Sequence, residues 1–114
     1  MPNSNLVLGR WGEDLATSWY RDRGYALVAR NWRCPIGEID LIVRRRRLLV
    51  VVEVKARRTE TFGPAAAAVG PTKQQRLRRL AAEWLAISGI RGVEVRFDVV
   101  AVTGTEIEVI EGAF

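Results

Sequence analysis

Hydrophobic residues recur at helical spacing in the first part of the chain. From Leu8 onward, Trp11, Leu15 and Trp19 follow one another at intervals of three or four residues, and the positions between them are largely polar. Gly24 ends the pattern, as a glycine commonly does just past a helix. We therefore expect a helix that starts at Leu8 and stops at Gly24, with both tryptophans in its buried stripe.

Strand-like segments follow this helix. Residues 25–32 form a short, largely apolar segment, and residues 34–37 have the composition of a turn. Apolar and β-branched residues then dominate 37–44 and 48–55 on either side of a run of arginines, which is typical of a β-hairpin. The second hairpin strand has apolar residues on both faces, so we expect it to lie in the centre of a sheet.

A second helix is expected from Pro71, because proline suits the first turn of a helix. Leu77, Leu80 and Trp84 supply its buried stripe, and Gly89 ends it.

The last part of the chain contains two more strands, at 93–102 and 106–110. The order is then helix, three strands, helix, two strands. We expect one α/β domain over residues 1–114, with a mixed sheet of about five strands flanked by helices. The strand–helix–strand section should be a right-handed crossover, which makes its two strands parallel.

Charged residues interrupt the two hairpin strands, which are otherwise composed for burial. Glu38 and Asp40 share one face of the first strand, and Glu53 and Lys55 share one face of the second, because side chains alternate along a strand. A hairpin loop with an even number of residues would place all four on the same side of the sheet, with roughly 5–8 Å between the Cβ atoms of Asp40 and Glu53. An odd loop would separate them.

Two carboxylates at that separation repel each other unless a positive charge lies between them. A divalent cation meets this need, since Mg²⁺ is commonly held by one or two carboxylates together with water and substrate phosphate. The chain has no histidine, which argues against zinc sites and against a histidine base. Oxygen ligands beside a lysine suit hydrolysis of a phosphodiester assisted by Mg²⁺ or Mn²⁺, with Lys55 orienting the water or stabilising the developing charge.

The alternative interpretation of Glu53 and Lys55 is a surface ion pair, which is the commoner meaning of this spacing. The apolar residues on both faces of the strand favour the site, because they place the polar pair at the end of a covered strand.

Several sequence blocks, in order, resemble a known family. Asp40 followed by Glu53-Val54-Lys55 resembles the Asp…(Asp/Glu)-x-Lys signature of the restriction-endonuclease-like nucleases. A closer resemblance, over nearly the whole chain, is to the YraN-type family of small bacterial proteins, and it rests on GRWGEDLA at 9–16, GEIDLI at 37–42, VEVKAR at 52–57, Lys73-Gln74 and RFDVV at 96–100.

This resemblance implies a restriction-endonuclease-like fold and a role for individual residues. It makes Asp40 and Glu53 metal ligands and Lys55 the catalytic lysine. Glu13 matches the first-helix glutamate that archaeal Holliday-junction resolvases add to the metal site, although an ion pair at the helix boundary is an equal alternative. Ile39 stands where the nuclease signature usually has proline, a departure that removes no chemical group.

The charge of the chain favours a polyanionic partner. The net charge is +5, from 18 basic and 13 acidic residues, and phosphate neutralisation releases counterions, although a solvated basic surface is the alternative. The arginines at 44–47 lie at the hairpin tip, some 10–20 Å from the carboxylates by strand rise. The candidates for phosphate contacts instead lie in the loop and helix after Glu53: Arg57, Arg58, Lys73, Gln74, Arg76 and Arg78. For Lys73 and Gln74 the alternative is a polar pair in the capping region of the helix.

Two function classes follow. The first is a divalent-metal-dependent endonuclease acting on nucleic acid, DNA before RNA; the second is a nucleic-acid-binding or interaction module that does not cleave. The intact set Asp40, Glu53 and Lys55 favours the enzyme. We expect a cytoplasmic protein without a membrane partner, because the chain has a lone Cys34, no signal peptide and no apolar run long enough for a membrane span. Whether it forms a homodimer stays open.

Overall fold

The computed structural model describes residues 4–57 and 69–114, and its order of helices and strands confirms the one expected from the sequence. The first four strands end one or two residues later than their patterns indicated, and the first and fourth also begin one residue later. The fifth has the expected bounds, and the first helix begins four residues before Leu8. The elements are α1 Ser4–Asp22, β1 Ala26–Cys34, β2 Gly37–Arg45, β3 Leu48–Arg57, α2 Pro71–Ser88, β4 Glu94–Thr103 and β5 Glu106–Ile110.

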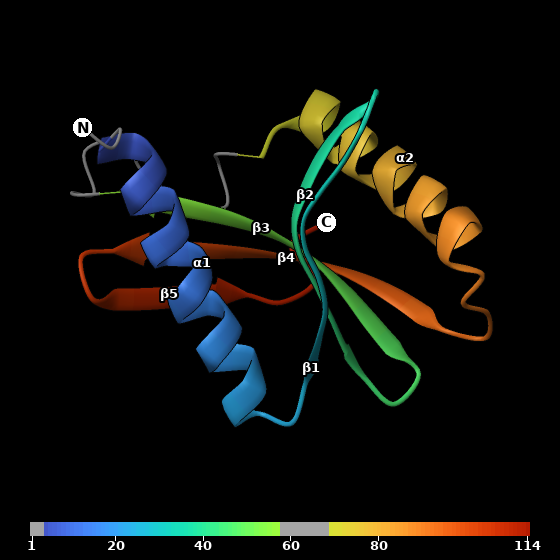
Figure 1. The fold of residues 1–114 in the computed structure, drawn as a ribbon, viewed down its shortest axis with the longest axis horizontal. Helices are drawn as coiled ribbons and strands as arrows, with labels where there is room; N and C mark the ends of the chain where they lie inside the picture. Colours follow the sequence, from blue (N-terminus) through green and yellow to red (C-terminus); the bar gives the residue numbers. More distant parts are fainter. Residues whose placement is uncertain (1–3, 58–68) are drawn as a thin grey trace.

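The strands form one five-stranded mixed sheet in the order β1-β2-β3-β4-β5, as Figure 1 shows. Strand β3 lies in the centre, as its apolar residues on both faces predicted. It is antiparallel to β2 and parallel to β4, with α2 in the connection between β3 and β4. The expected fold class and the parallel pairing across this connection are confirmed.

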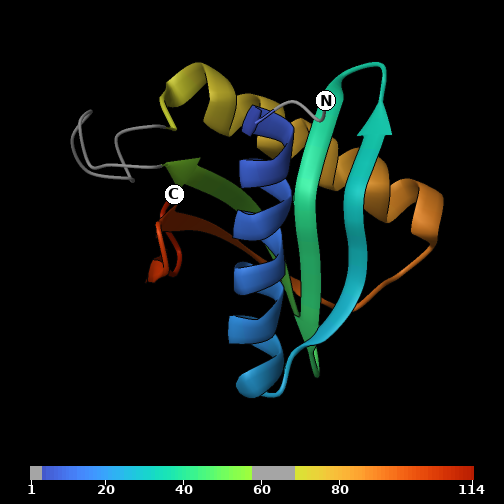
Figure 2. The same cartoon turned by 60° about the vertical axis from the view of Figure 1, so that its left-hand side comes forward.

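The two helices cover opposite faces of the sheet, which Figure 2 shows from the side. Alternation along β3 divides its side chains between two hydrophobic cores: Val50 and Val52 face α1, whereas Leu49 and Val51 face α2. The α2 core contains the stripe expected from the sequence, Leu77, Leu80 and Trp84, together with Ala81.

The prediction that Trp11 is buried is wrong. Its side chain is 47% exposed, and its indole N–H donates a hydrogen bond to the carbonyl of Gly104 at 3.1 Å. At this level of α1 the residue that faces the sheet is Gly12, where an added Cβ would lie 2.8 Å from the Cβ of Ala56. The buried stripe of α1 is therefore Gly12, Ala16 and Tyr20, one residue further along than the tryptophan pattern indicated.

A two-residue turn at Arg46 and Arg47 fixes the register of the central hairpin. Arg46 has the left-handed φ of 56° that such tight turns need, and the pairing begins with Arg45 opposite Leu48. The loop is therefore even, and even positions of β2 lie opposite odd positions of β3, as the convergence of Asp40 and Glu53 requires.

A buried carboxylate joins α1, β4 and the C-terminal segment. Asp98, 1% exposed, accepts a 2.6 Å hydrogen bond from the Tyr20 hydroxyl, a pair of bonds from the Arg96 guanidinium, and one from the Gly112 backbone N–H. Arg96 is therefore the counter-ion of this buried carboxylate. Burial, reinforced by Asp98, raises the pKa of Tyr20 well above its usual value, so the tyrosine acts here as a hydrogen-bond donor.

Neither described helix has a stretch apolar and long enough to cross a membrane.

Candidate active site

The candidate site lies where β2 and β3 separate. Their pairing runs from Arg45 and Leu48 as far as Leu41 opposite Val52, after which β2 bends away from the centre of the sheet (Figure 1). The next residue of β2 is Asp40, and its carboxylate accepts a 2.8 Å hydrogen bond from the backbone N–H of Val54. The aspartate thus takes the place of a strand partner at the point where the ladder stops.

Asp40 is a carboxyl group whose ionisation is strongly opposed. Burial raises its pKa, and repulsion from Glu53, Glu13 and Glu38 raises it further, to about 7, while the N–H of Val54 acts in the opposite direction. The three other carboxylates belong to three different elements, β3, α1 and β2. The fold therefore gathers negative charge around one partly buried aspartate, as the sequence predicted for Asp40 and Glu53.

Glu53 and Asp40 border the same small cavity on the α2 side. This cavity has a volume of about 180 Å³, and its other lining residues include Glu38 and Lys73. The ammonium of Lys73 lies 2.6 Å from the Oε1 atom of Glu53, whose side chain is only 13% exposed. Lys73 therefore supplies a positive charge beside Glu53.

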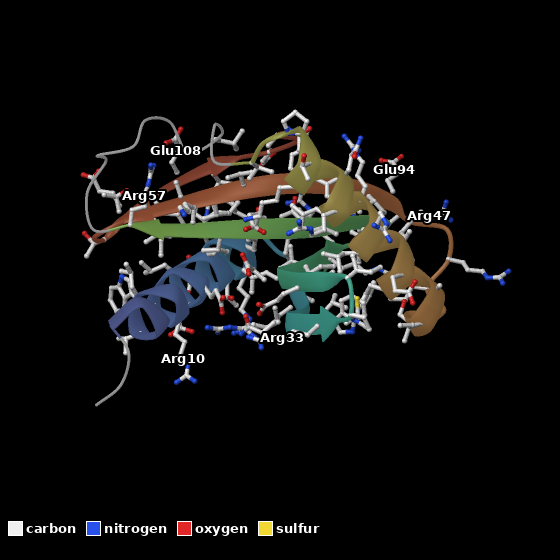
Figure 3. All side chains as sticks on the ribbon, turned by 90° about the horizontal axis from the view of Figure 1, so that it is seen from above. Arg10, Arg33, Arg47, Arg57, Glu94 and Glu108 are labelled. Atoms are coloured by element: carbon white, nitrogen blue, oxygen red, sulfur yellow. The ribbon has the colours of Figure 1, made fainter. Side chains whose placement is uncertain are left out.

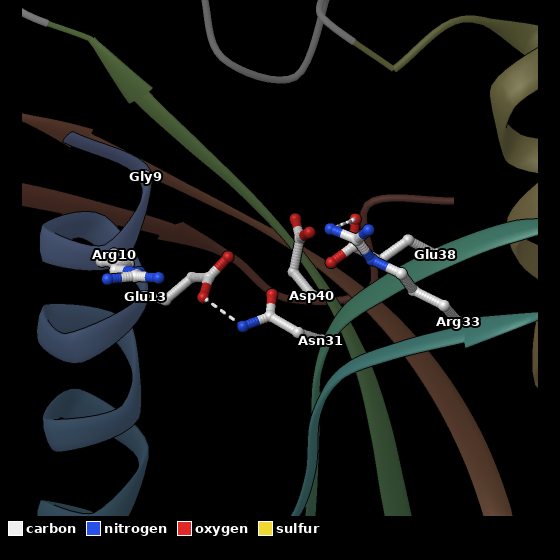
Figure 4. Close-up of a pocket in the computed structure, with 7 residues that line it drawn as sticks. All are labelled: Gly9, Arg10, Glu13, Asn31, Arg33, Glu38 and Asp40. Carbon is white, nitrogen blue, oxygen red and sulfur yellow. Dashed lines mark hydrogen bonds and ion pairs between the residues drawn. The ribbon is translucent and has the colours of Figure 1, made fainter. Parts of the chain in front are cut away.

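A second hollow, of about 370 Å³, borders Asp40 and Glu38 on the α1 side and is shown in Figure 4. Glu13 enters it from α1, but its Oε1 atom already accepts hydrogen bonds from Arg30 at 3.2 Å and from Asn31 at 3.0 Å. Glu13 thus forms the ion pair that was its alternative, and its charge also contributes to raising the pKa of Asp40.

Lys55 lies two residues beyond Glu53 on the same face of β3. Its backbone is opposite Ala101 of β4, as that of Glu53 is opposite Val99, and both of these partners belong to the α2 core. The side chain is exposed and does not line either of the two cavities around Asp40. The lysine is therefore near the carboxylates in the sheet but on the solvent side of them.

The predicted phosphate-contacting residues lie in different places. Arg57 ends β3, and Arg58 lies outside the described residues. Arg76 lines the cavity with Glu53 and Lys73. Arg78 instead lies over the stacked rings of Phe97 and Phe114, at 5.3 Å from each centroid.

Gln74 makes a contact in the capping region of α2, which was its alternative. Its side-chain amide donates a 3.0 Å hydrogen bond to the carbonyl of Val69, just before α2 begins. It therefore ties the start of α2 to the preceding segment, a contact that helps to fix Lys73 beside Glu53.

Three residues of the α1-side hollow were missed by the sequence analysis: Arg10, Asn31 and Arg33. Asn31 has a φ of 54°, a left-handed conformation that asparagine tolerates better than most residues. Arg33 lies 3.6 Å from Glu38 (Figure 4). The one available signal was the polar pair Arg30-Asn31 inside an otherwise apolar strand.

The donor set fits a hard divalent cation held by two carboxylates. Asp40 and Glu53 border one cavity, and Mg²⁺ or Mn²⁺ needs only one or two carboxylates when water and phosphate complete its coordination. Within residues 4–57 and 69–114 no three acidic, histidine or cysteine side chains are grouped closely enough to hold an ion as they stand. A role for Glu13 as a third ligand stays a prediction, because its carboxylate would have to leave Arg30 and Asn31.

The raised pKa of Asp40 predicts that metal-free protein loses stability as the pH rises. The pKa is about 7 in the folded chain against an ordinary 3.8, so the folded state binds more protons between these values. The free energy of unfolding should fall across this interval by up to about 1.4 kcal/mol per pH unit, because the stabilisation present at low pH is lost as Asp40 ionises. Urea unfolding in chelator at several pH values would measure the slope.

Asp40→Asn is the control for this slope, because the amide does not ionise. The wild type and the variant should diverge as the pH rises, with the variant the more stable near pH 8. Parallel stability profiles for the two proteins would show that Asp40 is not the titrating group.

Comparison with other sequences gives one family. A model of the family described as "Uncharacterised protein family UPF0102" matches residues 12–102. A UPF0102 protein from Nocardia farcinica is 52% identical over 99 residues, covering 87% of this chain and 78% of the relative. Another, from Syntrophotalea carbinolica, is 42% identical over 118 aligned positions, covering 100% of this chain and 96% of the relative. The chain therefore belongs to the UPF0102 family, which confirms the family resemblance of its sequence blocks.

Proposed function

We propose that this protein is a divalent-metal-dependent endonuclease that hydrolyses phosphodiesters in DNA. The observation that carries the proposal is that Asp40 and Glu53 border one cavity, with Glu38 beside them and Glu13 in the adjoining hollow. This crowding of carboxylates raises the pKa of Asp40 to about 7. Stability alone does not favour such an arrangement, because a buried carboxylate beside like charges opposes its own ionisation. The same carboxylates that repel one another would attract a divalent cation, so their crowding favours metal binding.

Asp40 and Glu53 are the residues that would hold Mg²⁺ or Mn²⁺. The cation, when bound, supplies charge stabilisation at the phosphate and makes a water molecule more acidic. Lys55, on the same face of β3 and open to solvent, stabilises the negative charge that develops on the phosphate. The hydrogen bond from the Val54 N–H fixes the Asp40 carboxylate in the gap between the strands.

Basic residues on both sides of Asp40 support a nucleic-acid substrate. Arg10 and Arg33 line the hollow on the α1 side, and Lys73 and Arg76 line the cavity on the α2 side. A strand that placed a phosphate at Asp40 would therefore have cationic groups to bind its neighbouring phosphates in both directions. Arg47, by contrast, lies at the opposite end of the sheet from Arg57 (Figure 3).

The salt dependence of DNA binding tests this placement. Removing one cation that binds a phosphate should reduce the slope of log affinity against log salt by about 0.9, so Arg10→Ala with Arg76→Ala should lower it by about 1 to 2. The two residues are exposed, so the fold should persist. Fluorescence anisotropy with a labelled duplex, over a series of salt concentrations and with chelator present, gives the slope.

The matched control removes two exposed arginines from the hairpin turn. Arg46→Ala with Arg47→Ala changes the net charge equally but should leave most of the slope intact. Arg45 is left in place because its guanidinium lies over the Tyr25 ring and donates to the Arg23 carbonyl. An equal reduction of the slope in the two double variants would mean that the nucleic acid lies elsewhere.

The second candidate function is nucleic-acid binding without cleavage, and the ion pair between Lys73 and Glu53 supports it. That ion pair neutralises one carboxylate without any metal. A binding module would have the same DNA affinity in metal and in chelator and would cleave no substrate. Incubating the purified protein with DNA under both conditions separates the two functions.

A further inference from the structure

Lys73 occupies a position that its helix does not favour. It is the third residue of α2, in the first turn, where the partial positive charge of the helix end repels a cation. The first turn contains no acidic residue, and the cap residue Gly70 provides no side-chain hydrogen bond. The contact that compensates is outside the helix: the ammonium lies 2.6 Å from the carboxylate of Glu53.

This contact competes with the proposed metal site. Glu53 is one of the two carboxylates that border the cavity with Asp40, and its Oε1 atom is the one that Lys73 contacts. An ammonium at hydrogen-bonding distance and a divalent cation cannot both use that oxygen at close range without strong repulsion. The Lys73 side chain is 45% exposed on a flexible four-carbon stem, so it can move outward without disturbing the core.

We infer that Lys73 is the resident counter-cation of Glu53, which a divalent metal ion displaces, and that the displaced ammonium then binds a phosphate of the nucleic acid. This inference rests on the proposed function and adds to it a coupling between metal binding and nucleic-acid binding. Without metal, the lysine is held by Glu53 and the site repels phosphate. With metal, the repulsion is relieved and one more cation becomes available to the substrate. Metal binding and nucleic-acid binding therefore strengthen each other, and the coupling is the same in both directions.

Metal affinity in the absence of nucleic acid tests the competition. Lys73→Gln removes the competing ammonium, so Mn²⁺ should bind about fivefold more tightly than to the wild type, as expected from losing an ion pair worth up to about 1 kcal/mol. Lys73→Arg keeps a cation beside Glu53 and should return the affinity toward that of the wild type. Isothermal titration of metal-stripped protein with Mn²⁺ gives these values, and circular dichroism checks the fold.

Arg76→Gln is the matched control. Arg76 lines the same cavity and its replacement removes the same charge, but its guanidinium makes no ion pair with Glu53 in the described part of the chain. If only the overall charge mattered, both glutamine variants would gain affinity equally. The inference requires that Lys73→Gln gain several times more than Arg76→Gln.

The second arm measures DNA affinity with and without Mn²⁺ in a Lys55→Ala background, which slows cleavage during the measurement. The increase in DNA affinity on adding Mn²⁺ should be several-fold smaller when Lys73→Gln is also present, because this variant has no ammonium to release. Equal Mn²⁺ affinity for wild type and Lys73→Gln, or an unchanged gain in DNA affinity, overturns this inference and leaves the proposed function standing. Failure of both proteins to bind Mn²⁺ overturns the proposed function together with it.

Discussion

Replacing Asp40 with asparagine should lower metal-dependent DNA cleavage by on the order of 10³-fold, because it removes one of the two charges that hold the cation. The amide oxygen can still accept the hydrogen bond from the Val54 N–H, so the gap between β2 and β3 should keep its shape. DNA affinity measured in chelator should persist, because the arginines around the site are unchanged. Cleavage rates at saturating DNA, with Mn²⁺ or Mg²⁺ in excess, measure the effect.

The same variant should not unfold the protein. Asp40 is surrounded by Glu53, Glu13 and Glu38, whose repulsion raises its pKa, and removing the charge relieves that repulsion. Thermal unfolding in chelator near pH 8 should therefore show a variant at least as stable as the wild type. A variant that loses its fold along with its activity, or one that cleaves at the wild-type rate, would contradict the assignment of Asp40 as a metal ligand.

Lys55→Ala should separate metal binding from the chemical step. Loss of a single charge-stabilising group at a reacting centre typically lowers the rate by about 10² to 10³-fold, and we expect a decrease in that range. Mn²⁺ affinity should change little, because the lysine is exposed and lies outside the cavity that Asp40 and Glu53 border. Single-turnover cleavage together with Mn²⁺ titration of the same preparation gives both quantities.

Stability should be unaffected by Lys55→Ala, to within about 0.5 kcal/mol, as for most exposed positions. The outcome that would remove Lys55 from the mechanism is a variant that cleaves as fast as the wild type. If the variant instead failed to bind Mn²⁺, Lys55 would be acting on the carboxylates and not on the phosphate.

The arrangement of strands and carboxylates was predictable because it depends on periodicity. Side chains alternate along a strand, so an even turn was enough to bring Asp40 of β2 and Glu53 of β3 together. The central position of β3 followed in the same way from its apolar residues on both faces. Such inferences need only local spacing and one loop length.

The contacts between distant elements were not predictable in this way. The pattern of α1 pointed to Trp11, but the sheet lies against Gly12, whose lack of a side chain allows the close approach to Ala56. That approach brings the next residue, Glu13, to Arg30 and Asn31 of β1. No spacing rule links residues 13 and 30, and the pairing depends on how α1 crosses the sheet.

The partner of Lys73 was hidden for a related reason. In the sequence Lys73 lies one turn before Leu77 of the buried stripe, but this spacing does not indicate which strand residue the lysine would meet. The approach of Lys73 to Glu53 follows from the packing of Leu77, Leu80 and Trp84 on the sheet. Helix packing thus decides whether this lysine contacts phosphate or carboxylate.

The central claim is that Asp40 and Glu53 hold a divalent cation with which the protein cleaves DNA. Its most direct test is a titration of purified wild-type protein with Mn²⁺ or Mg²⁺, followed by incubation of each titration point with linear and four-way DNA and with chelator in parallel. We expect saturable cation binding, with strand breaks that rise with occupancy and disappear in chelator. Absence of cation binding, or strand breaks that continue in chelator or survive equally in Asp40→Asn, would contradict the claim.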